Sequence, residues 1–337
     1  MFIAVVALVG AVVPTIFYVS FVWWLDRYEK EPFWLLLLAF AWGAIPAAIL
    51  SAMVEVLVDM SIGAVAGQSL VADLASVSVS APLVEESAKG VALLALVLLF
   101  RREFDGVLDG IVYGAMIGFG FALSENLFAY FLPILSADGL GVGLTNIFMR
   151  TVVFGFNHAF WTAVTGAAVG YARLAAEPIR RMLLPVAGWS GAVVLHGVHN
   201  AGATLVQQTL CLSLGVSVMI HWGGLALLLA VAVQIWRKEK EWIERGLAEE
   251  VRQGILTPQE FDVMRSARRR QQARWQALSQ GGRPAHGAVE AYFQQATKLA
   301  FTKQHLRTLG DEGGNLAEIE RLREVMVESR TAAAPWL

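Results

Sequence analysis

The chain has 337 residues, of which 56% are hydrophobic and 16% charged, and its formal net charge at pH 7 is −2. This apolar excess is typical of integral membrane proteins and argues against an ordinary soluble domain. The single cysteine, Cys211, excludes an intramolecular disulfide and a cysteine-based zinc site.

Seven stretches are apolar and long enough to cross a bilayer, which requires roughly 20 residues. In chain order they lie at about 2–25, 33–58, 74–100, 107–133, 145–172, 183–205 and 209–236. The first has neither a basic leader nor a small-residue cleavage motif, so we interpret it as a retained span rather than a signal peptide. The sequence therefore predicts an all-α, polytopic membrane helix bundle over residues 1–236.

The remaining residues, 237–337, have a different composition. They hold 17 of the 26 lysines and arginines and 14 of the 28 acidic residues. Helix-length stretches flank a predicted loop at "SQGGRPAHG", residues 279–287. We expect a soluble, mostly helical tail with a solvated surface. Binding of a membrane surface or of a cytoplasmic partner is the alternative.

Basic residues predict how the bundle is oriented. Because basic loops stay on the cytoplasmic side, we expect the N-terminus outside, the tail in the cytoplasm and a multi-pass position in the cell membrane. The topology explains where the basic residues fall, so the lipid bilayer is an expected partner and nucleic acid is not. The loops at about 59–73, 134–144 and 206–208 contain no lysine or arginine, and the alternate loops contain Arg27, Lys30, Arg101, Arg102, Arg173, Arg180 and Arg181.

Ionisable side chains inside the predicted spans are candidates for function. Each is costly in a bilayer unless it is paired or faces a polar cavity. Glu85 and Glu86 lie near the midplane of the span at 74–100. Four further polar residues lie between the midplane and the outer half of three other spans: Glu125, His158, His196 and Asn200. This common depth predicts a single site.

The spacing within "PLVEESAKG" suggests a division of roles. Glu85 and Lys89 are four residues apart, so Lys89 is expected to neutralise Glu85 and to leave Glu86 for chemistry. Neighbouring side chains on an α-helix diverge by about 100°. We therefore do not expect Glu85 and Glu86 both to point squarely at one site.

Other polar residues receive supporting or structural interpretations. His196 and Asn200 share a helix face, so Asn200 could orient the imidazole. His199 is either a member of the site or a packing histidine. Arg150 is expected to reach the outer headgroups rather than a substrate carbonyl. Structural or interfacial roles are expected for Asp109 and His221, and contact with water at the outer end of the second span for Glu55 and Asp59.

Glycines recur at helical spacing in "GVLDGIVYGAMIGFGF". Four glycines four residues apart lie on one face of a helix and allow another helix to approach closely. We expect a packing seam at Gly106, Gly110, Gly114 and Gly118.

Buried carboxylates near histidines fit hydrolytic chemistry. A carboxylate can take a proton from water, and a histidine can polarise the attacked carbonyl or protonate the leaving amine. The same residue types could hold a catalytic zinc ion, so both a zinc-dependent and a metal-free mechanism stay open. The candidate ligands are Glu86, Glu125, His158 and His196. There is no H-E-x-x-H, no G-x-S-x-G and no pair of intramembrane aspartates, which removes support from those mechanisms.

Four short motifs follow one another on separate spans. They are "EESAK" for E-E-x-x-K, "FALSEN" for F-x-x-x-E, "NHAFWTAVTG" around a histidine, and "HGVHN" for H-x-x-x-N/D. In this order they resemble the motifs of the PrsW intramembrane proteases. That family belongs to a wider group with the CAAX prenyl endopeptidases and with bacteriocin-processing, abortive-infection-type membrane proteins. The resemblance covers about residues 15–205 and leaves the tail outside.

The resemblance implies an intramembrane endopeptidase. Its expected substrate is a membrane protein, typically single-span and such as an anti-sigma factor, cut in or near the transmembrane segment. By analogy Glu85 or Glu86 would activate water together with Glu125, and the site would be completed by His158, His196 and Asn200, with support from Lys89, Phe121 and His199. The wider group often has histidine where this chain has Glu125, so zinc or no cofactor stays open.

Two other classes of function fit the same residues. Buried Glu, Lys and His groups also mark ion pathways, so a proton-coupled transporter or channel is one alternative. A non-catalytic membrane scaffold whose tail recruits a partner is the other.

Overall fold

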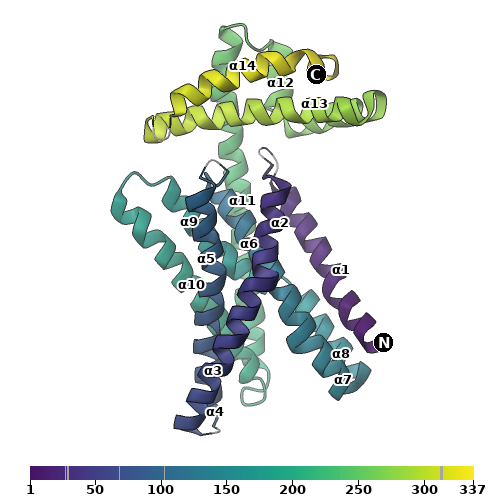
Figure 1. Ribbon diagram of the computed structural model, residues 1–337, viewed down its shortest axis with the longest axis vertical. Coiled ribbons are helices and arrows are strands. Elements are labelled where there is room, and N and C mark those ends of the chain that lie inside the picture. Colours follow the sequence, from purple (N-terminus) through teal and green to yellow (C-terminus); the bar gives the residue numbers. More distant parts are fainter. Residues whose placement is uncertain (27, 29, 68, 102, 312–313) are drawn as a thin grey trace. The chain divides into compact units, whose positions relative to one another are not determined.

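The computed structural model describes residues 1–26, 28, 30–67, 69–101, 103–311 and 314–337. These residues form helices and short connections, with no strand among them (Figure 1). The chain separates into two compact units: unit 1 is Met1–Leu25 with Glu31–Ala230, and unit 2 is Asp26–Lys30 with Val231–Leu337. The predicted all-α membrane bundle is confirmed. Arg27 and Arg102, which contribute to the predicted orientation, lie outside the described residues.

Unit 1 contains ten helices in its described part, and α11 (Leu212–Arg252) begins in it and ends in unit 2. The ten are α1 (Phe2–Leu25), α2 (Phe33–Trp42), α3 (Ala48–Ala66), α4 (Leu70–Ala75), α5 (Ala81–Leu99), α6 (Val107–Ser124), α7 (Leu132–Ala137), α8 (Gly139–Phe148), α9 (Asn157–Arg173) and α10 (Pro178–Thr204). Four π-helical turns adjoin them: η1 (Gly43–Ala47), η2 (Ser76–Ser80), η3 (Glu125–Phe131) and η4 (Met149–Val153).

Six helical segments of the described chain are long and apolar enough to cross a membrane, where the sequence predicts seven. They are Phe2–Leu25, Phe33–Val65, Val107–Ala137, Gly139–Arg173, Pro178–Thr204 and Leu212–Arg252. The expected span at 74–100 is helical from α4 through η2 to α5, but Glu85, Glu86 and Lys89 make it too polar to qualify by composition. All three side chains are buried. The passage of this segment across the membrane stays a prediction.

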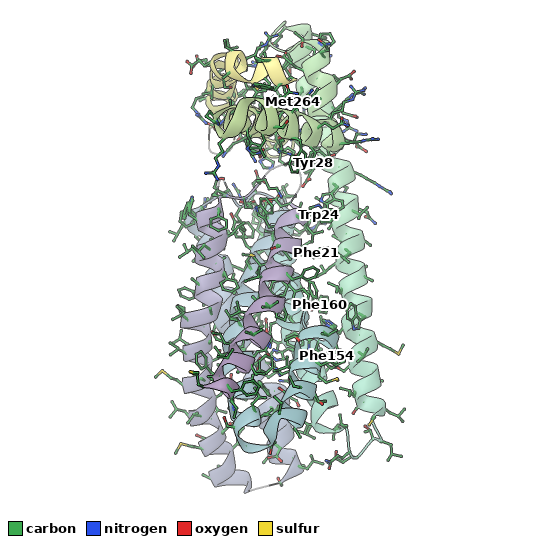
Figure 2. The ribbon with its side chains drawn as sticks, turned by 90° about the vertical axis from the view of Figure 1, so that its right-hand side faces the viewer. Phe21, Trp24, Tyr28, Phe154, Phe160 and Met264 are labelled. Carbon is green, nitrogen blue, oxygen red and sulfur yellow. The ribbon has the colours of Figure 1, made fainter. Side chains whose placement is uncertain are left out.

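Helix α6 is the central element of unit 1. It packs against α9, α2, η1, α1 and α5, and most of its side chains are buried. Helix α1 instead exposes apolar side chains such as Val9 and Phe17, and Phe21 and Trp24 stack on one another along it (Figure 2). An apolar outer surface around a polar interior is the arrangement expected of a helix bundle in lipid.

Unit 2 has its own hydrophobic core, formed by the end of α11 with α12 (Pro258–Met264), α13 (Ala267–Leu309), α14 (Asn315–Ala333) and the short 3₁₀ turn η5 (Ala334–Trp336). Met264 and Tyr28 pack in this core (Figure 2). The loop predicted at 279–287 is a tight turn at Gly282, where φ is 73° and α13 divides into two helical segments. Arg274 and Glu290 form an ion pair across this turn, although 16 residues of a straight helix would span about 24 Å, so the two segments fold back on one another. Glycine tolerates this left-handed conformation, so the chain can reverse direction there within one tight turn.

Candidate active site

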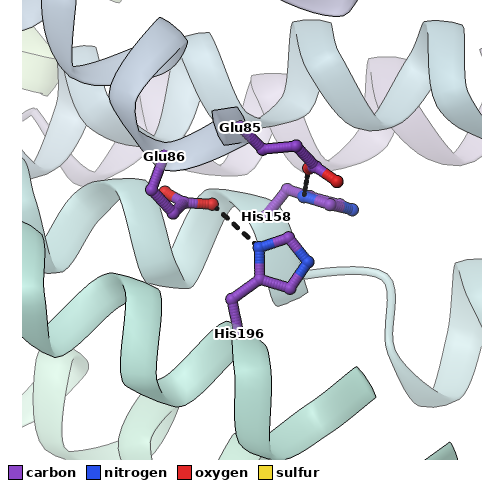
Figure 3. Close-up of side chains that lie close together, drawn as sticks. All are labelled: Glu85, Glu86, His158 and His196. Atoms are coloured by element: carbon purple, nitrogen blue, oxygen red, sulfur yellow. Dashed lines mark hydrogen bonds and ion pairs between the residues drawn. The ribbon is translucent and has the colours of Figure 1, made fainter. Parts of the chain in front are cut away.

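Polar side chains from three helices meet inside unit 1. Glu85 and Glu86 come from α5, His158 from α9 and His196 from α10 (Figure 3). All four residues are buried, and one ligand atom from each lies within 4.8 Å of those of the other three. The structure thus brings together four of the residues that the sequence selects.

The ammonium group of Lys89 links this cluster. Its Nζ lies 3.1 Å from Oε2 of Glu85, 2.8 Å from Oε1 of Glu86 and 3.1 Å from Nδ1 of His158. It also stands 3.8 Å from the centre of the Phe121 ring. The expectation that the two glutamates could not share one site is wrong, because their rotatable side chains offset the divergence of the backbone directions. Lys89 therefore neutralises both carboxylates rather than leaving Glu86 free.

Glu86 is held by several partners. Its Oε1 lies 3.1 Å from Nδ1 of His196, and its Oε2 accepts from the hydroxyl of Thr162 at 3.3 Å. The indole of Trp161 stacks on the His196 ring, with centroids 4.0 Å apart and an interplanar angle of 15°. The Glu86 side chain is 0% exposed, so the paired Glu86 and His196 are enclosed by protein groups.

Glu125 contacts the opposite side of the His158 ring. An ammonium group only donates, so Nδ1 of His158 accepts from Lys89, and its Nε2–H donates to Oε2 of Glu125 over 2.9 Å. Arg150 forms an ion pair with the same carboxylate and lies 3.5 Å from the centre of the Tyr130 ring. The expectation that Arg150 reaches the headgroups is wrong, because these two partners hold its guanidinium against the protein. Glu125 and Arg150 both lie in π-helical turns, which often occur at functional sites.

Two predicted site residues on α10 make contacts outside the cluster. Nδ2 of Asn200 donates to the carbonyl oxygen of Val77 over 2.9 Å, so it joins α10 to η2 instead of orienting the neighbouring imidazole as expected. Nε2 of His199 lies 3.0 Å from Nδ2 of Asn157, and its Nδ1 lies 2.7 Å from Oγ of Ser217. Side-chain direction, rather than spacing along the helix, decides both outcomes.

The glycine seam sets the position of α9. A Cβ atom on Gly118 would lie 2.3 Å from the carbonyl oxygen of His158, and one on Gly114 would lie 2.5 Å from that of Thr162. No larger residue fits this approach, so the predicted packing seam is confirmed at these positions. The seam brings His158 and Thr162 directly beside α6, which also carries Phe121.

Two further polar residues have the structural surroundings expected of them. Oδ2 of Asp109 accepts from the backbone N–H groups of the two residues that precede α6, at 2.9 and 2.6 Å, and thereby caps that helix. His221 lies beside the rings of Phe154 and Phe160, with centroids 6.0 and 6.1 Å away.

The cluster opens onto a cavity of about 570 Å³. Glu85, Phe121, Glu125 and Asn200 line it, together with residues of η1, α3, η2 and η3. A smaller cavity, of about 50 Å³, borders Glu125, Arg150, His158 and His196. Glu86 lines neither of these two cavities, so the arrangement favours Glu85 for contact with water, where the spacing of the sequence favours Glu86.

Several residues around this site are missed by sequence reasoning. Thr162 and Trp161 hold Glu86 and His196, but nothing in a lone threonine or tryptophan of an apolar helix indicates that contact. Glu55, for which contact with water at the outer end of the second span is expected, lines the larger cavity. Its charge inside a predicted span singles it out in the sequence but does not indicate that cavity.

The centre of the cluster fits a divalent metal ion. Two carboxylates and two imidazoles are ligand types that zinc and related ions bind. The sequence predicts Glu125 as a ligand, but the structure places Glu85 in this set in its place. Glu125 is paired with Arg150. Lys89 contacts three of the four donor groups, so a bound cation would compete with its ammonium group.

Comparison with known proteins gives a consistent assignment. The family model for PrsW family intramembrane metalloproteases matches residues 31–234, more than half of the chain. "Protease PrsW" of Bacillus subtilis (strain 168) is 28% identical over 216 residues, which cover 64% of this chain and 91% of that protein. "Protease PrsW" of Geobacillus kaustophilus (strain HTA426) is 28% identical over 195 residues, which cover 57% of this chain and 76% of that protein. No solved structure gives a significant match.

Proposed function

Since the chain belongs to the PrsW family of intramembrane metalloproteases, we propose that it hydrolyses a peptide bond in or next to the transmembrane segment of a single-span membrane protein. One observation carries the proposal. The carboxylate of Glu85 lies in a buried cluster of acids and imidazoles and also lines a cavity of about 570 Å³, a size typical of ligand sites.

In this proposal Glu85 activates water. Its Oε2 accepts from Lys89, and its other oxygen has no hydrogen-bond partner among the described residues. That oxygen takes a proton from a water molecule while the water oxygen attacks the carbonyl carbon. When the C–N bond breaks, the carboxyl group gives the proton to the leaving amine, so one water molecule is consumed and Glu85 is regenerated.

The neighbouring groups orient Glu85 and balance charge. Lys89 aligns its carboxylate, and Glu86 holds Lys89 in turn. Arg150 borders the smaller cavity next to Glu125. By pairing with Glu125, which lines both cavities, it balances the charge of that carboxylate.

The same cluster can hold the metal ion that the family description implies. Catalytic zinc sites use three protein ligands and an open position, and Glu86, His158 and His196 would supply the three while Glu85 acts on water. When bound, such an ion serves as a Lewis acid for the attacked carbonyl. Elemental analysis should find one divalent ion per chain, and none in His196→Ala. Metal-free wild-type protein that still cleaves would contradict this role.

The orientation is also proposed. Residues 1–236 form the membrane peptidase domain, the N-terminus lies outside and residues 237–337 form a cytoplasmic tail that binds a partner. The alternate placement of basic loops supports the orientation. The tail lies beyond the family match, which supports a role separate from the chemistry. Reporter fusions at Met1 and Leu337 should report opposite sides of the membrane, and the same side for both would contradict the orientation.

Cleavage by the full-length protein in lipid nanodiscs tests the function. Wild-type protein should produce defined fragments from at least one member of a panel of labelled single-span proteins. Glu125→Gln weakens the contacts that position His158 and Arg150, and it should lose about 100-fold in rate, as expected when an active site is misaligned. Asp138→Asn, which removes an exposed carboxylate between α7 and α8, is the control and should cleave normally. Full cleavage by Glu125→Gln, or ion flux without cleavage of any substrate, would reject the proposal.

A further inference from the structure

One wall of the larger cavity takes no part in the chemistry above. Helix α3 and the preceding turn η1 present one face to it, with residues at helical spacing: Ala44, Ala48, Ala52, Glu55 and Asp59. Glu85 lines the same cavity. The wall formed by α3 therefore leads directly to the candidate base.

Ser51 and Glu55 carry polar atoms without partners on this wall. Ser51 is 1% exposed, and its Oγ has no hydrogen-bond partner among the described residues, although a helical serine can bond the carbonyl four residues earlier. Oε1 of Glu55 is also buried and lacks a partner in the described part of the chain. Buried polar groups are normally hydrogen-bonded. Both atoms therefore point to a polar ligand, and an unwound peptide offers backbone N–H groups that suit two acceptors.

The charge of the cavity indicates which side chain that peptide carries. Its described lining contains no lysine or arginine but four carboxylates, those of Glu55, Asp59, Glu85 and Glu125. The last two are paired with Lys89 and Arg150. Neither Glu55 nor Asp59 has a cationic partner among the described residues, and Asp59 accepts from the hydroxyl of Ser76. This uncompensated negative charge is complementary to a cation on the ligand.

Resting on the proposed peptidase function, we propose that this cavity is the substrate-binding groove. Its occupant is an unwound segment of the substrate, and Glu55 and Asp59 select a lysine or arginine side chain near the bond that is cut. Ser51 accepts a hydrogen bond from the peptide backbone.

Helix geometry gives the position of the selected residue. Ser76, the partner of Asp59, precedes Glu85 on one continuous helical segment. Their separation is about 13 Å at 1.5 Å per residue, and Glu55, one helical turn from Asp59, lies about 6 Å nearer to Glu85. An extended peptide advances about 3.3 Å per residue. The basic residue is therefore expected about two to four positions from the scissile bond.

Paired substrates test this selection with the full-length protein in nanodiscs. Each pair differs only by lysine against glutamine, scanned over four positions on either side of the cleaved bond. At the best position we expect kcat/KM to favour lysine about tenfold, within the range for a partly desolvated charge pair. In the double variant Glu55→Gln, Asp59→Asn this ratio should fall to about one, whereas Asp138→Asn should keep it.

Two results would contradict the proposed groove. Each can be told apart from failure of the peptidase function. If all substrates are cut and the wild-type ratio is near one at every position, the selection is absent although the peptidase function stands. If none is cut, the peptidase function fails, and binding of the same lysine and glutamine substrates, measured by energy transfer to the labelled protein, decides the groove. Tighter binding of lysine that the double variant abolishes supports it, and equal binding overturns it.

Discussion

Each unit contains a buried charge network, and the two differ in their balance of donors and acceptors. In unit 2, Lys303 and Arg323 converge on the fully buried carboxylate of Glu250, and both of its oxygens accept hydrogen bonds. In unit 1, the single ammonium group of Lys89 serves two carboxylates and an imidazole. In the network of unit 2, both oxygens of Glu250 have a donor. In the network of unit 1, there are more acceptors than donors.

The comparison shows that burial of charge does not by itself identify a reactive site. A carboxylate whose oxygens are all occupied can stabilise the fold but cannot take a proton from water. Glu85 has an oxygen without a partner among the described residues and lines a cavity. A surplus of acceptors with access to a cavity is therefore the feature on which we assign the proposed reaction to unit 1 rather than to unit 2.

Apart from loss of the proposed base itself, the largest effect in this comparison is expected from His158→Ala. The imidazole joins Lys89 to Glu125, and loss of alignment at an active site can cost about 100-fold in rate. Initial cleavage rates in nanodiscs would measure it. The matched control is His286→Ala in α13 of unit 2, which should cleave at the wild-type rate. Equal rates for both variants would show that the cluster does not participate.

Replacing the central lysine of each network shows how much that lysine contributes to the free energy of unfolding. Lys89→Met leaves two carboxylates buried without their cation and should lower the free energy of unfolding by about 3–5 kcal/mol. Lys303→Met should cost less, because Arg323 still pairs with Glu250. Denaturant titration of the full chain, followed by hydrogen exchange in each unit, gives both values. Equal losses would contradict the proposed difference in charge balance.

The glycine seam supports only the network of unit 1. In Gly118→Ala, the new methyl group would meet the carbonyl of His158, and we expect a loss of about 1–3 kcal/mol in unfolding free energy. Slower cleavage should accompany it. Gly141→Ala, where a Cβ would meet no atom within 4 Å, is the control and should leave both quantities near wild type. Unchanged stability in Gly118→Ala would show that α9 is free to shift.

The smallest effect concerns acid sensitivity in unit 2. Burial opposes ionisation of Glu290, but hydrogen bonds from Arg274 hold its pKa below the usual 4.5. The ion pair therefore stabilises the folded state above that value and loses its contribution as pH falls through the folded-state pKa. We expect a loss of about 1 kcal/mol, since the pair is partly exposed. Hydrogen exchange of α13 at neutral and acidic pH measures it, and Arg274→Gln should lose this pH dependence.

The bundle and the members of the site could be read from the sequence for one physical reason. Hydrocarbon excludes charge, so apolar runs define spans, and Glu85, Glu86, His158 and His196 stand out within them. The sequence could not predict which of these groups contact one another. Lys89 contacts both glutamates, and Arg150 turns toward Glu125, because side-chain torsions settle only when the helices are packed.

Other features left no distinctive pattern in the sequence. The length of the turn in "SQGGRPAHG" could not be predicted, since glycine and proline occur both in loops and at helix ends, and only packing in unit 2 confines the break to Gly282. Ser51 is an ordinary serine in an apolar helix. Its importance depends on the cavity that α3 shares with Glu85.

The most direct test compares one carboxylate from each network. Single-turnover cleavage of one labelled single-span substrate should fall about 10²–10⁴-fold in Glu85→Gln, the range for loss of a general base. Glu250→Gln, corrected for the amount of folded protein, should cleave at the wild-type rate. Full activity in Glu85→Gln, or an equal loss in both variants, would contradict the assignment of hydrolysis to the unit 1 network.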